Sequence, residues 1–547
     1  MDIKSRMGQI VLWGAGSTTL LVTPFFSYDP INVPRFLSVL VLGLIGFFLL
    51  LGAKRELLGF KFRRVLFPTI AFIVWSLVAL FASEVNLIEG FFGVTGRQTG
   101  FLAYFALIVL MLLAVLSSSV FQQNKLVLLL VWVGLLSGLY GVLQALGGDP
   151  FDWINPYSPV FGFFGNPNFQ ASFMGMAAVS AVALSLKSSD KLMIRIRFIG
   201  FVLLALFNIY QSKSQQGYLV FLAGVVVVGY LYVRTNLKSK KFSLMYLVAS
   251  MVGFVAVLLD ILQKSLWSSI LYKESVTFRG DFWRAGWKMT SDNPVFGVGL
   301  DGYRDHYRAS RDLVTALRPG SDAMTDSAHN VFLDISSGGG FPLLIIYVFL
   351  IGLTIISAIK VIRRSTGFDV GFAAVLGAWV AYLAQSLISI NQLGLAVWGW
   401  VLMGTIIGYE INTREKIEVK SAKTVKSGYS MVAIGLGFII GLGIGLPLMV
   451  ADAAFRSTAK SGDVLKIEAS VRQWPQSVTR MTLAAQILRE GDLPDRSIVI
   501  AREAVEFNPM NFEAWRELSL QPNATESERV LAQETMKKLD PFNPNLK

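Results

Sequence analysis

The sequence predicts an all-α, polytopic membrane protein of about 13 transmembrane helices, followed by a soluble helical domain. Composition is the first observation: 54% of the 547 residues are hydrophobic and only 16% are charged, with a mean hydropathy of +0.56. Soluble domains of this length do not have such a composition. Second, apolar runs of spanning length recur, and basic residues cluster in every second loop between them. Third, the chain becomes polar and nearly charge-balanced after about residue 452.

The first apolar run is followed by Tyr28, Asp29 and Pro30 rather than by a small-residue cleavage site. It is therefore interpreted as a span and not as a signal sequence. The predicted spans lie at roughly 8–26, 35–53, 65–83, 101–118, 126–146, 169–186, 196–211, 217–233, 243–262, 339–359, 368–388, 394–411 and 429–450. The predicted organisation is thus transmembrane helices in roughly 1–262, a long loop in 263–338, transmembrane helices in 339–451 and a soluble domain in 452–547.

Basic residues set the predicted orientation, because Lys and Arg are enriched in cytoplasmic loops. If Lys4 and Arg6 lie in the cytoplasm, every strongly basic loop lies there too, and the net charge of +13 needs no nucleic-acid partner. The outer face then receives long loops at about 84–100, 147–168 and 263–338, together with the C-terminal tail. The basic loops contain Lys54, Arg55, Lys61, Arg63 and Arg64; Lys187, Lys191, Arg195 and Arg197; Arg234, Lys238, Lys240 and Lys241; Lys360, Arg363 and Arg364; and Arg414, Lys416, Lys420, Lys423 and Lys426.

The tail contains a sequence pattern that occurs twice. Ala501 to Pro509 places small residues before an Asn-Pro turn, and Ala532 to Pro541 repeats the pattern with Asp-Pro about 31 residues later. This pattern resembles tetratricopeptide repeats, although the spacing is shorter than usual. Two interpretations stay open: a surface that binds a protein partner, and a small helical cap.

Both histidines of the chain, His306 and His329, lie in the predicted loop at 263–338. His329 comes shortly before a predicted span, so its imidazole is expected near the membrane surface. With a pKa near neutrality it is suited to take a proton from a hydroxyl group. Asp326 and Asp334 are near enough in sequence to orient it. The alternative is a structural histidine that caps the next helix, and this alternative is favoured for His306.

Cysteine is absent and histidine is rare, which limits the chemistry of the chain. No disulfide framework and no thiolate chemistry are possible, and a zinc site is not expected. The sequence therefore predicts neither a metal nor a cofactor.

Arginines in the same loop form two candidate anion sites. Arg304, Arg308 and Arg311 are spaced i, i+4 and i+7, which places them on one face of a helix, where guanidinium groups suit a diphosphate. The alternative is a solvated face with local acidic partners. Arg279 precedes Trp283, and Arg284 lies between Trp283 and Trp287, a pair one turn apart that is typical of an interfacial helix. Both arginines are therefore expected at the depth of a lipid-linked phosphate, or serve as ordinary interfacial anchors. The local acidic partners considered are Asp301, Asp305 and Asp312.

Three further segments on the predicted outer face contain candidate residues. Arg97 lies in a glycine-rich turn at 93–100. Asn166 and Asn168 are suited to bind sugar hydroxyls, or to serve as turn and N-cap residues. The glycines of Asn293-Pro294-Val295-Phe296-Gly297-Val298-Gly299 predict a tight turn rather than a nucleotide loop, because the dinucleotide fingerprint is incomplete.

These pieces occur in an order that resembles the O-antigen ligase and polymerase superfamily of bacterial membrane glycosyltransferases, which includes protein O-oligosaccharyltransferases. The resemblance runs from about Gly93 to Tyr409. The residues that carry it are Gly96-Arg97 with Gly100; Gly165-Asn166-Pro167-Asn168; Arg279 with Trp283; Pro294 with Gly297-Val298-Gly299; and His329-Asn330 with Leu333 and Gly340.

The resemblance implies a GT-C-like fold in the bacterial inner membrane and a metal-free, inverting transfer of a glycan from undecaprenyl diphosphate. His329 would activate the acceptor hydroxyl, Arg279 would bind the leaving diphosphate, and Arg97 would assist. Asn330, next to His329, is a further candidate substrate contact. The acceptor would be a lipid A core, as in lipopolysaccharide biosynthesis, a second glycan repeat, or a protein Ser or Thr; a ligase is the default expectation.

One segment departs from the family pattern, which places a Ser-Arg pair at the outer end of the span near 211–217. Here Gln215 replaces the arginine. Lys213 can supply a positive charge but not the bidentate geometry of a guanidinium. Arg279, Arg284, Arg304 and Arg308 then supply the remaining candidate charges for the donor.

Two other classes of function compete with an enzyme. A transporter or lipid flippase usually places ionisable residues within its spans and shows repeated halves. The predicted spans are almost free of charge and no internal repeat is seen among them, which argues against a transporter. A scaffold that recruits partners through its tail would leave the His329 loop unexplained.

Overall fold

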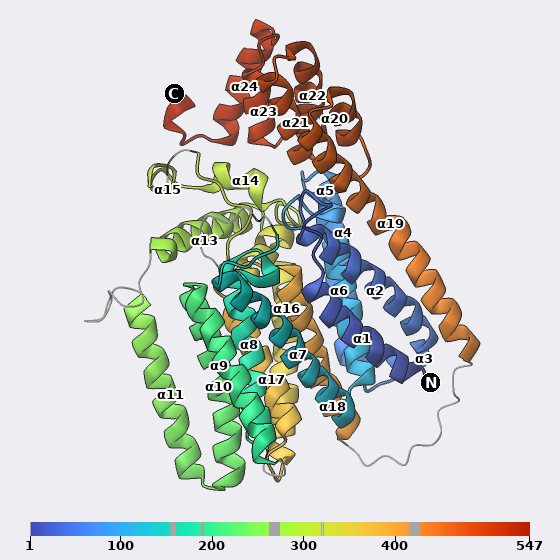
Figure 1. Ribbon diagram of the computed structural model, residues 1–547, viewed down its shortest axis with the longest axis vertical. Helices are drawn as coiled ribbons and strands as arrows, with labels where there is room; N and C mark the ends of the chain where they lie inside the picture. Colours follow the sequence, from blue (N-terminus) through green and yellow to red (C-terminus); the bar gives the residue numbers. More distant parts are fainter. Residues whose placement is uncertain are drawn as a thin grey trace.

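Every regular element in the part of the chain that the structure describes is a helix, which confirms the predicted fold class (Figure 1). The computed structural model describes residues 2–151, 153, 160–187, 191–261, 274–318, 320, 322–414 and 427–546. The predicted basic residues Lys416, Lys420, Lys423 and Lys426 lie outside these ranges, as do parts of the 147–168 and 263–338 loops. The two largest apolar cores lie inside a helical bundle and among the C-terminal helices.

Each predicted span coincides with one helix of the bundle. Eight helices are long and apolar enough to cross a membrane within the described ranges, so the protein is a multi-pass membrane protein. They are α2 (Asn32–Gly52), α4 (Arg63–Ala82), α7 (Val120–Ala145), α9 (Leu192–Gln211), α10 (Gln215–Asn236), α16 (Val331–Arg364), α18 (Leu393–Thr413) and α19 (Ser427–Ser461). Shorter apolar segments are α6 (Phe101–Ser117), α17 (Val370–Ser386) and the part Lys241–Ala256 of α11 (Lys240–Ile261).

Two further helices occupy predicted spans but are less apolar: α1 (Ile3–Leu20) and α8 (Pro167–Ser185). Their sequences are rich in small and hydroxyl residues, because both pack closely against other helices. α8 packs on α9, α10 and α17 and buries most of its residues, so protein rather than lipid surrounds it. The predicted spans therefore differ in how apolar they are and in how much of each is buried inside the bundle.

The bundle has two ends with different contents. At one end, the N-terminus lies beside α3 (Lys54–Leu57), where Lys4 Nζ is 2.6 Å from Glu56 Oε1 (Figure 1). The opposite end is called the outer end below, after its predicted orientation. It holds α5 (Leu87–Phe92), α13 (Glu274–Asp292), α14 (Tyr303–Ser310) and α15 (Leu313–Leu317), and the C-terminal helices above them. The basic loop at 54–64 and the described part of the long loop, from Glu274 onward, thus lie at opposite ends, as the sequence predicts. Which end faces the cytoplasm stays a prediction.

α16 begins earlier than the span predicted at 339–359. Its first residue is Val331, and it is kinked at Gly339 and Gly340, where Gly340 adopts φ +70°. A Cβ at Gly340 would lie 2.2 Å from the Val295 carbonyl oxygen, so a close approach of the 293–299 turn requires glycine there. Gly297 and Gly299 have φ of +66° and +93°, which agrees with the predicted tight turn. The segment before the kink forms part of the outer end of the bundle.

The C-terminal helices pack in sequence order around their own apolar core. They are α20 (Val464–Val471), α21 (Val478–Glu490), α22 (Pro494–Phe507), α23 (Phe512–Ser519) and α24 (Glu526–Leu539), followed by the short 3-10 helix η2 (Pro544–Leu546). α19 continues without interruption from the last span to Ser461, so it joins the bundle to these helices directly. The likeness to tetratricopeptide repeats stays a prediction.

Polar contacts fix the C-terminal helices to the outer end of the bundle. Asn86 donates a hydrogen bond to the Phe507 carbonyl, and Asn508 donates one to Glu89. The backbone N–H of Val478 also donates to Glu89, which is buried. The tail therefore lies on the same side of the bundle as α5 and α14.

Candidate active site

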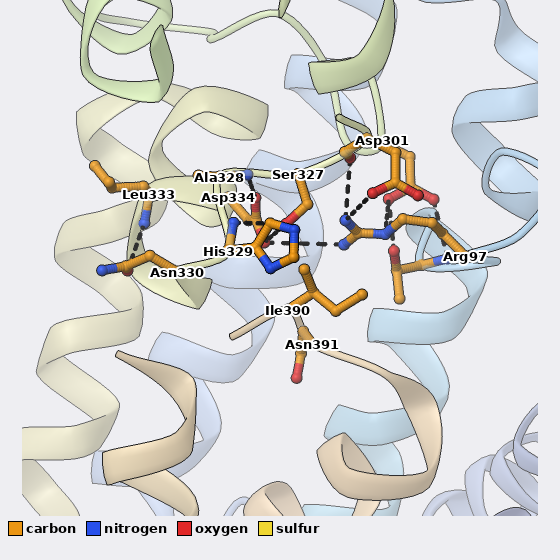
Figure 2. A network of polar contacts seen from close by, with 12 residues as sticks. Arg97, Asp301, Ser327, Ala328, His329, Asn330, Leu333, Asp334, Ile390 and Asn391 are labelled. Carbon is orange, nitrogen blue, oxygen red and sulfur yellow. Dashed lines mark hydrogen bonds and ion pairs between the residues drawn. The ribbon is translucent and has the colours of Figure 1, made fainter. Parts of the chain in front are cut away.

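The predicted site residues converge at the outer end of the bundle. They come from the loop between α5 and α6, the first turn of α8, the turn between α9 and α10, helix α13, and the loop that leads into α16. Figure 2 shows Arg97 reaching from the α5–α6 loop toward Asp301 and Asp334, with His329 above Ile390 and Asn391. Elements far apart in the sequence thus meet around the histidine.

His329 sits in an unusual backbone conformation that its neighbours enforce. Its φ is +52°, which is uncommon for a residue with a side chain. Its N–H donates to Ser327 Oγ at 2.9 Å, and Ser327 Oγ donates to Asp334 Oδ2 at 3.0 Å. The Ala328 N–H donates to Asp334 Oδ1 at 2.8 Å. Asp334 therefore orients the histidine through the backbone of its loop, and strain held in this way is frequent at functional sites.

The imidazole of His329 lies in a partly buried aromatic setting. Its ring stacks on Phe282 of α13, with ring centroids 5.4 Å apart, and Phe282 in turn packs against Tyr307 of α14. Burial, and then the positive charges of Arg279 and Arg97, lower the pKa of His329 to about 4, although Asp326 opposes this shift. The sequence led us to expect a pKa near neutrality; the structure instead keeps the imidazole neutral at pH 7.

Arg97 is held by acidic groups on three sides. Its guanidinium lies 4.0 Å from Asp301, 3.6 Å from Asp326 and 3.8 Å from Asp334, and it donates to the Asp326 carbonyl at 3.0 Å. Burial lowers its pKa, but the three carboxylates outweigh burial and raise it. Arg97 is thus fully charged and already paired, so it braces the His329 loop.

Arg279 differs from Arg97 in its partners, because no carboxylate of the described residues forms an ion pair with its guanidinium. Its Nη2 donates to Gln216 Oε1 at 3.2 Å, and Gln216 Nε2 donates to Ser172 Oγ at 2.8 Å. Burial lowers the pKa of Arg279 from its ordinary value. A largely buried guanidinium whose partner is a neutral amide keeps its full charge for an anion.

The amide that accepts from Arg279 belongs to Gln216, which directly follows Gln215. Gln215 and Lys213, in and beside the α9–α10 turn, are the residues that the sequence predicted to contribute here. Lys213 has φ +54°, Gln215 is the first residue of α10, and both make contacts. Sequence reasoning missed Gln216, although the departure from the family pattern marked its segment. It also missed Phe282 and Ser327, which no motif distinguishes.

The three predicted asparagines have structural partners. Asn166 caps α8 by accepting from the Asn168 N–H at 2.8 Å, and Asn330 caps α16 by accepting from the N–H groups of Phe332 and Leu333. Asn168 Oδ1 accepts from Ser214 Oγ at 2.7 Å. These positions fit the N-cap interpretation, and the cap before α16 is Asn330 rather than His329.

Arg284, Arg304 and Arg308 are placed away from a free anion site. Arg284 pairs with Asp281 at 2.7 Å and with Asp312 at 3.2 Å. Arg304 and Arg308 lie in α14, whereas Arg311 follows the helix with an extended backbone. All three are buried under the tail rather than solvated or open to a diphosphate. Their partners include Glu89, Asp305, Thr479, Glu513 and Asp540.

Asp540 is the centre of this buried interface. It lies 3.1 Å from Arg308 and 2.7 Å from Arg311, and none of its side chain is exposed. The expected diphosphate-binding role of Arg304 and Arg308 is therefore replaced by one of docking the tail. The second histidine, His306, has Nδ1 2.9 Å from the Gly302 carbonyl within α14, which fits the structural interpretation.

The described residues contain no group of three or more histidine, cysteine or acidic side chains arranged to hold a metal ion. The groups of chemical interest at the site are thus a neutral imidazole and a guanidinium without a carboxylate. Together they can accept a proton and bind an anion.

Residues 200–348 match the family model described as O-antigen ligase. This range covers α9 through the first half of α16, so it contains Gln216, Arg279 and His329 but not Arg97. No curated protein matches the chain.

Proposed function

Residues 200–348 place the chain in the O-antigen ligase and polymerase superfamily, and from this premise we propose that it is a glycosyltransferase that uses a lipid-linked donor. The proposed reaction transfers a glycan from undecaprenyl diphosphate to an acceptor hydroxyl, with inversion at the anomeric carbon. It takes place on the outer face of the bacterial inner membrane, with the tail on the same side.

One observation carries this proposal: a neutral imidazole lies within electrostatic reach of a guanidinium that has no carboxylate partner among the described residues. The positive charge of Arg279 contributes to lowering the pKa of His329, which supports a site in which both groups face one substrate. A transfer from a diphosphate needs a proton acceptor for the incoming hydroxyl and a positive group for the leaving anion. His329 and Arg279 meet these two needs.

The proposed step balances as follows. The acceptor O–H gives its proton to a ring nitrogen of His329, and the oxygen forms a bond to the anomeric carbon. The bond from that carbon to the diphosphate oxygen breaks, and its electron pair leaves with the diphosphate. Arg279 stabilises the leaving anion through hydrogen bonds from its guanidinium, which are strongest in a site that excludes water.

The low pKa of His329 supports this scheme when the donor is considered. A bound diphosphate offsets the positive charge of Arg279, and a nearby anion raises the pKa of an imidazole. Donor binding is therefore expected to raise the pKa of His329 toward the range in which general bases work best. The histidine is kept neutral before the donor arrives and becomes a stronger base once it is bound.

The acceptor class is open within this proposal. A lipid A core would make the protein a ligase, a second glycan repeat a polymerase, and a protein hydroxyl an oligosaccharyltransferase. The ligase remains the default. The tail uses one face to dock on α14 and leaves other faces for a protein partner, so a protein acceptor stays a second candidate.

Reconstitution in proteoliposomes with an undecaprenyl-diphosphate-linked oligosaccharide tests the proposal. Wild type should release undecaprenyl diphosphate and label an acceptor from the host membrane fraction. His329→Ala should lose roughly 10²–10⁴-fold in rate. Arg502→Ala, which removes an exposed ion pair in the tail, is the matched control. Full activity in both His329→Ala and Arg279→Gln would falsify the enzyme assignment, and donor movement across the bilayer without transfer would indicate a flippase.

A further inference from the structure

A cavity of about 150 Å³ lies next to Arg97 at the outer end of the bundle. It is formed where the start of α2, the α5–α6 loop, the first turn of α8 and the turn between α17 and α18 meet. None of its lining comes from α10 or α13, which hold Gln216 and Arg279. Its polar side chains are Asn32, Arg97, Thr99, Asn166, Asn391 and Gln392, and its apolar ones are Ile31, Phe164, Phe169 and Ile390.

One amide oxygen in the lining is buried without a hydrogen-bond partner among the described residues, and two further amide atoms form no hydrogen bond within that part of the chain. Gln392 is only 5% exposed, and its Oε1 is buried without a hydrogen bond. Neither Oδ1 of Asn32 nor Nδ2 of Asn166 has a hydrogen-bond partner among the described residues, whose contacts use only the other amide atom of each. Arg97 and Thr99, in contrast, already form polar contacts with Asp301. Because a buried carbonyl without a partner is costly, the lining is suited to a polar occupant.

Size and chemistry narrow the kind of occupant. A cavity of about 150 Å³ holds one six-membered ring. The vacant amide positions include both donors and acceptors, and sugar hydroxyls can pair with either. Phe164 and Phe169 offer apolar surface to the C–H groups of such a ring. The charge of Arg97 is already matched by acidic groups, so a neutral ring fits better than an anion.

We propose that this cavity binds one neutral pyranose ring of a glycan substrate, with Gln392 Oε1 accepting a hydrogen bond from a ring hydroxyl. The inference rests on the proposed transferase function and adds a sugar subsite to it. The subsite is linked to the reacting groups in two ways. Arg97 forms part of its wall and lies 3.8 Å from Asp334. Asn330, beside His329, donates to the Leu387 carbonyl of the turn that holds Ile390 and Gln392.

Gln392→Met tests this subsite, because methionine keeps the length of the side chain and removes the hydrogen-bonding atoms. Removing a buried carbonyl that has no partner should not lower thermal stability. The KM for one substrate should rise roughly three- to tenfold while kcat stays the same. A rise in the KM of the lipid-linked donor assigns the ring to the donor glycan, and a rise in the KM of the acceptor assigns it to the acceptor. Gln123→Met, a buried glutamine in α7 outside the cavity, should change neither KM.

A binding measurement separates this inference from the transferase proposal. The probe is the free oligosaccharide released from the donor by mild acid, observed by saturation-transfer NMR with the full-length protein in detergent. If wild type transfers no glycan but binds this probe, and Gln392→Met does not, the subsite stands while the transferase proposal falls. If Gln392→Met and Ile390→Phe, which fills the cavity, both keep wild-type KM values and wild-type probe binding, the cavity holds only water and the inference is wrong.

Discussion

Two sets of arginines in the same outer loop have opposite surroundings. Arg304, Arg308 and Arg311 are buried against carboxylates of the tail and of α5, whereas Arg279 is largely buried against a neutral amide. The three in and after α14 have the helical spacing that suggests phosphate binding, yet their charge is already used. Arg279 is not part of such a spaced set, yet its partner is a neutral amide, so its charge is available to an anion.

The difference shows what distinguishes a docking arginine from an anion-binding one. A guanidinium paired with a buried carboxylate contributes to holding two elements together, and losing its partner leaves an uncompensated charge. A guanidinium whose partner is a neutral amide keeps an unneutralised positive charge until an anion binds to it. The two sets should therefore respond differently to substitution: the first in the stability of the interface, the second in the rate of reaction.

The largest effect is expected from Asp540→Asn, which leaves Arg308 and Arg311 buried without their shared carboxylate. Breaking a buried pair in this way costs about 3–5 kcal/mol. Hydrogen exchange in the full-length protein should show faster exchange in both α14 and α24. Glu534→Gln, an exposed carboxylate of α24, is the control. If α14 exchanges at the wild-type rate in Asp540→Asn, the tail does not hold this helix.

A somewhat smaller effect is expected from Arg279→Gln, and on rate rather than stability. Loss of a group that stabilises a developing anion costs about 2.7–4 kcal/mol, or roughly 10²–10³-fold in kcat. Arg279→Lys should recover part of this rate, because an ammonium supplies charge without the bidentate geometry. Thermal stability should be nearly unchanged in both variants, because no carboxylate loses its partner. A stability loss equal to that of Asp540→Asn would erase the distinction between the two sets.

The pH dependence gives a third and smaller effect. Protonated His329 cannot accept a proton, so activity falls as pH drops below its pKa. In the free enzyme that pKa is about 4, and kcat/KM should follow it, whereas kcat reports the donor complex. The acidic limb of kcat should therefore lie roughly 1–3 units above that of kcat/KM. Arg279→Gln should move the acidic limb of kcat/KM to higher pH, because a positive charge near His329 is removed. If the limbs of kcat and kcat/KM coincide in wild type, donor binding does not raise the pKa of His329.

The smallest effect is expected at the surface of the tail. Arg502 pairs with Glu528 at 2.6 Å, but the Arg502 side chain is 48% exposed. Exposed pairs of this kind contribute about 0–1 kcal/mol. Arg502→Ala should therefore leave both hydrogen exchange at α14 and transfer rate within error of wild type. A clear loss of transfer would mean that this face of the tail takes part in acceptor binding.

The sequence predicted the helices well and the contacts between them poorly. Hydrophobic runs are local, so the bounds of α2 or α18 could be found from composition alone. The pairing of Arg311 with Asp540 spans 229 residues and depends on how the tail packs, which no local pattern records. The start of α16 was also missed, because the polar and glycine-rich stretch at 336–340 separates its first turns from the long apolar run.

The candidate site was likewise predicted in its individual residues but not in the contacts between them. The order of motifs predicted that Arg279 and His329 would matter, because both residues are chemically rare in their surroundings. It did not predict that Asp301 would bind Arg97 and Thr99, or that Phe282 would stack on the imidazole, because common residues stand out only once the chain is folded. The pKa of His329 depends on such neighbours, which is why its direction was not foreseen.

The continuous helix α19 has a consequence for the geometry of the whole molecule. Its 35 residues give a rod about 52 Å long, whereas the apolar layer of a bilayer is about 30 Å thick. An upright α19 thus raises the tail as a fixed-length stalk of about 20 Å and determines its rotation about the helix axis. Removing one residue would turn the tail by about 100° and carry Asp540 out of register with α14, whereas removing seven would nearly restore the angle at a lower height. The length of this helix therefore sets the height and the rotation at which the tail meets α5 and α14.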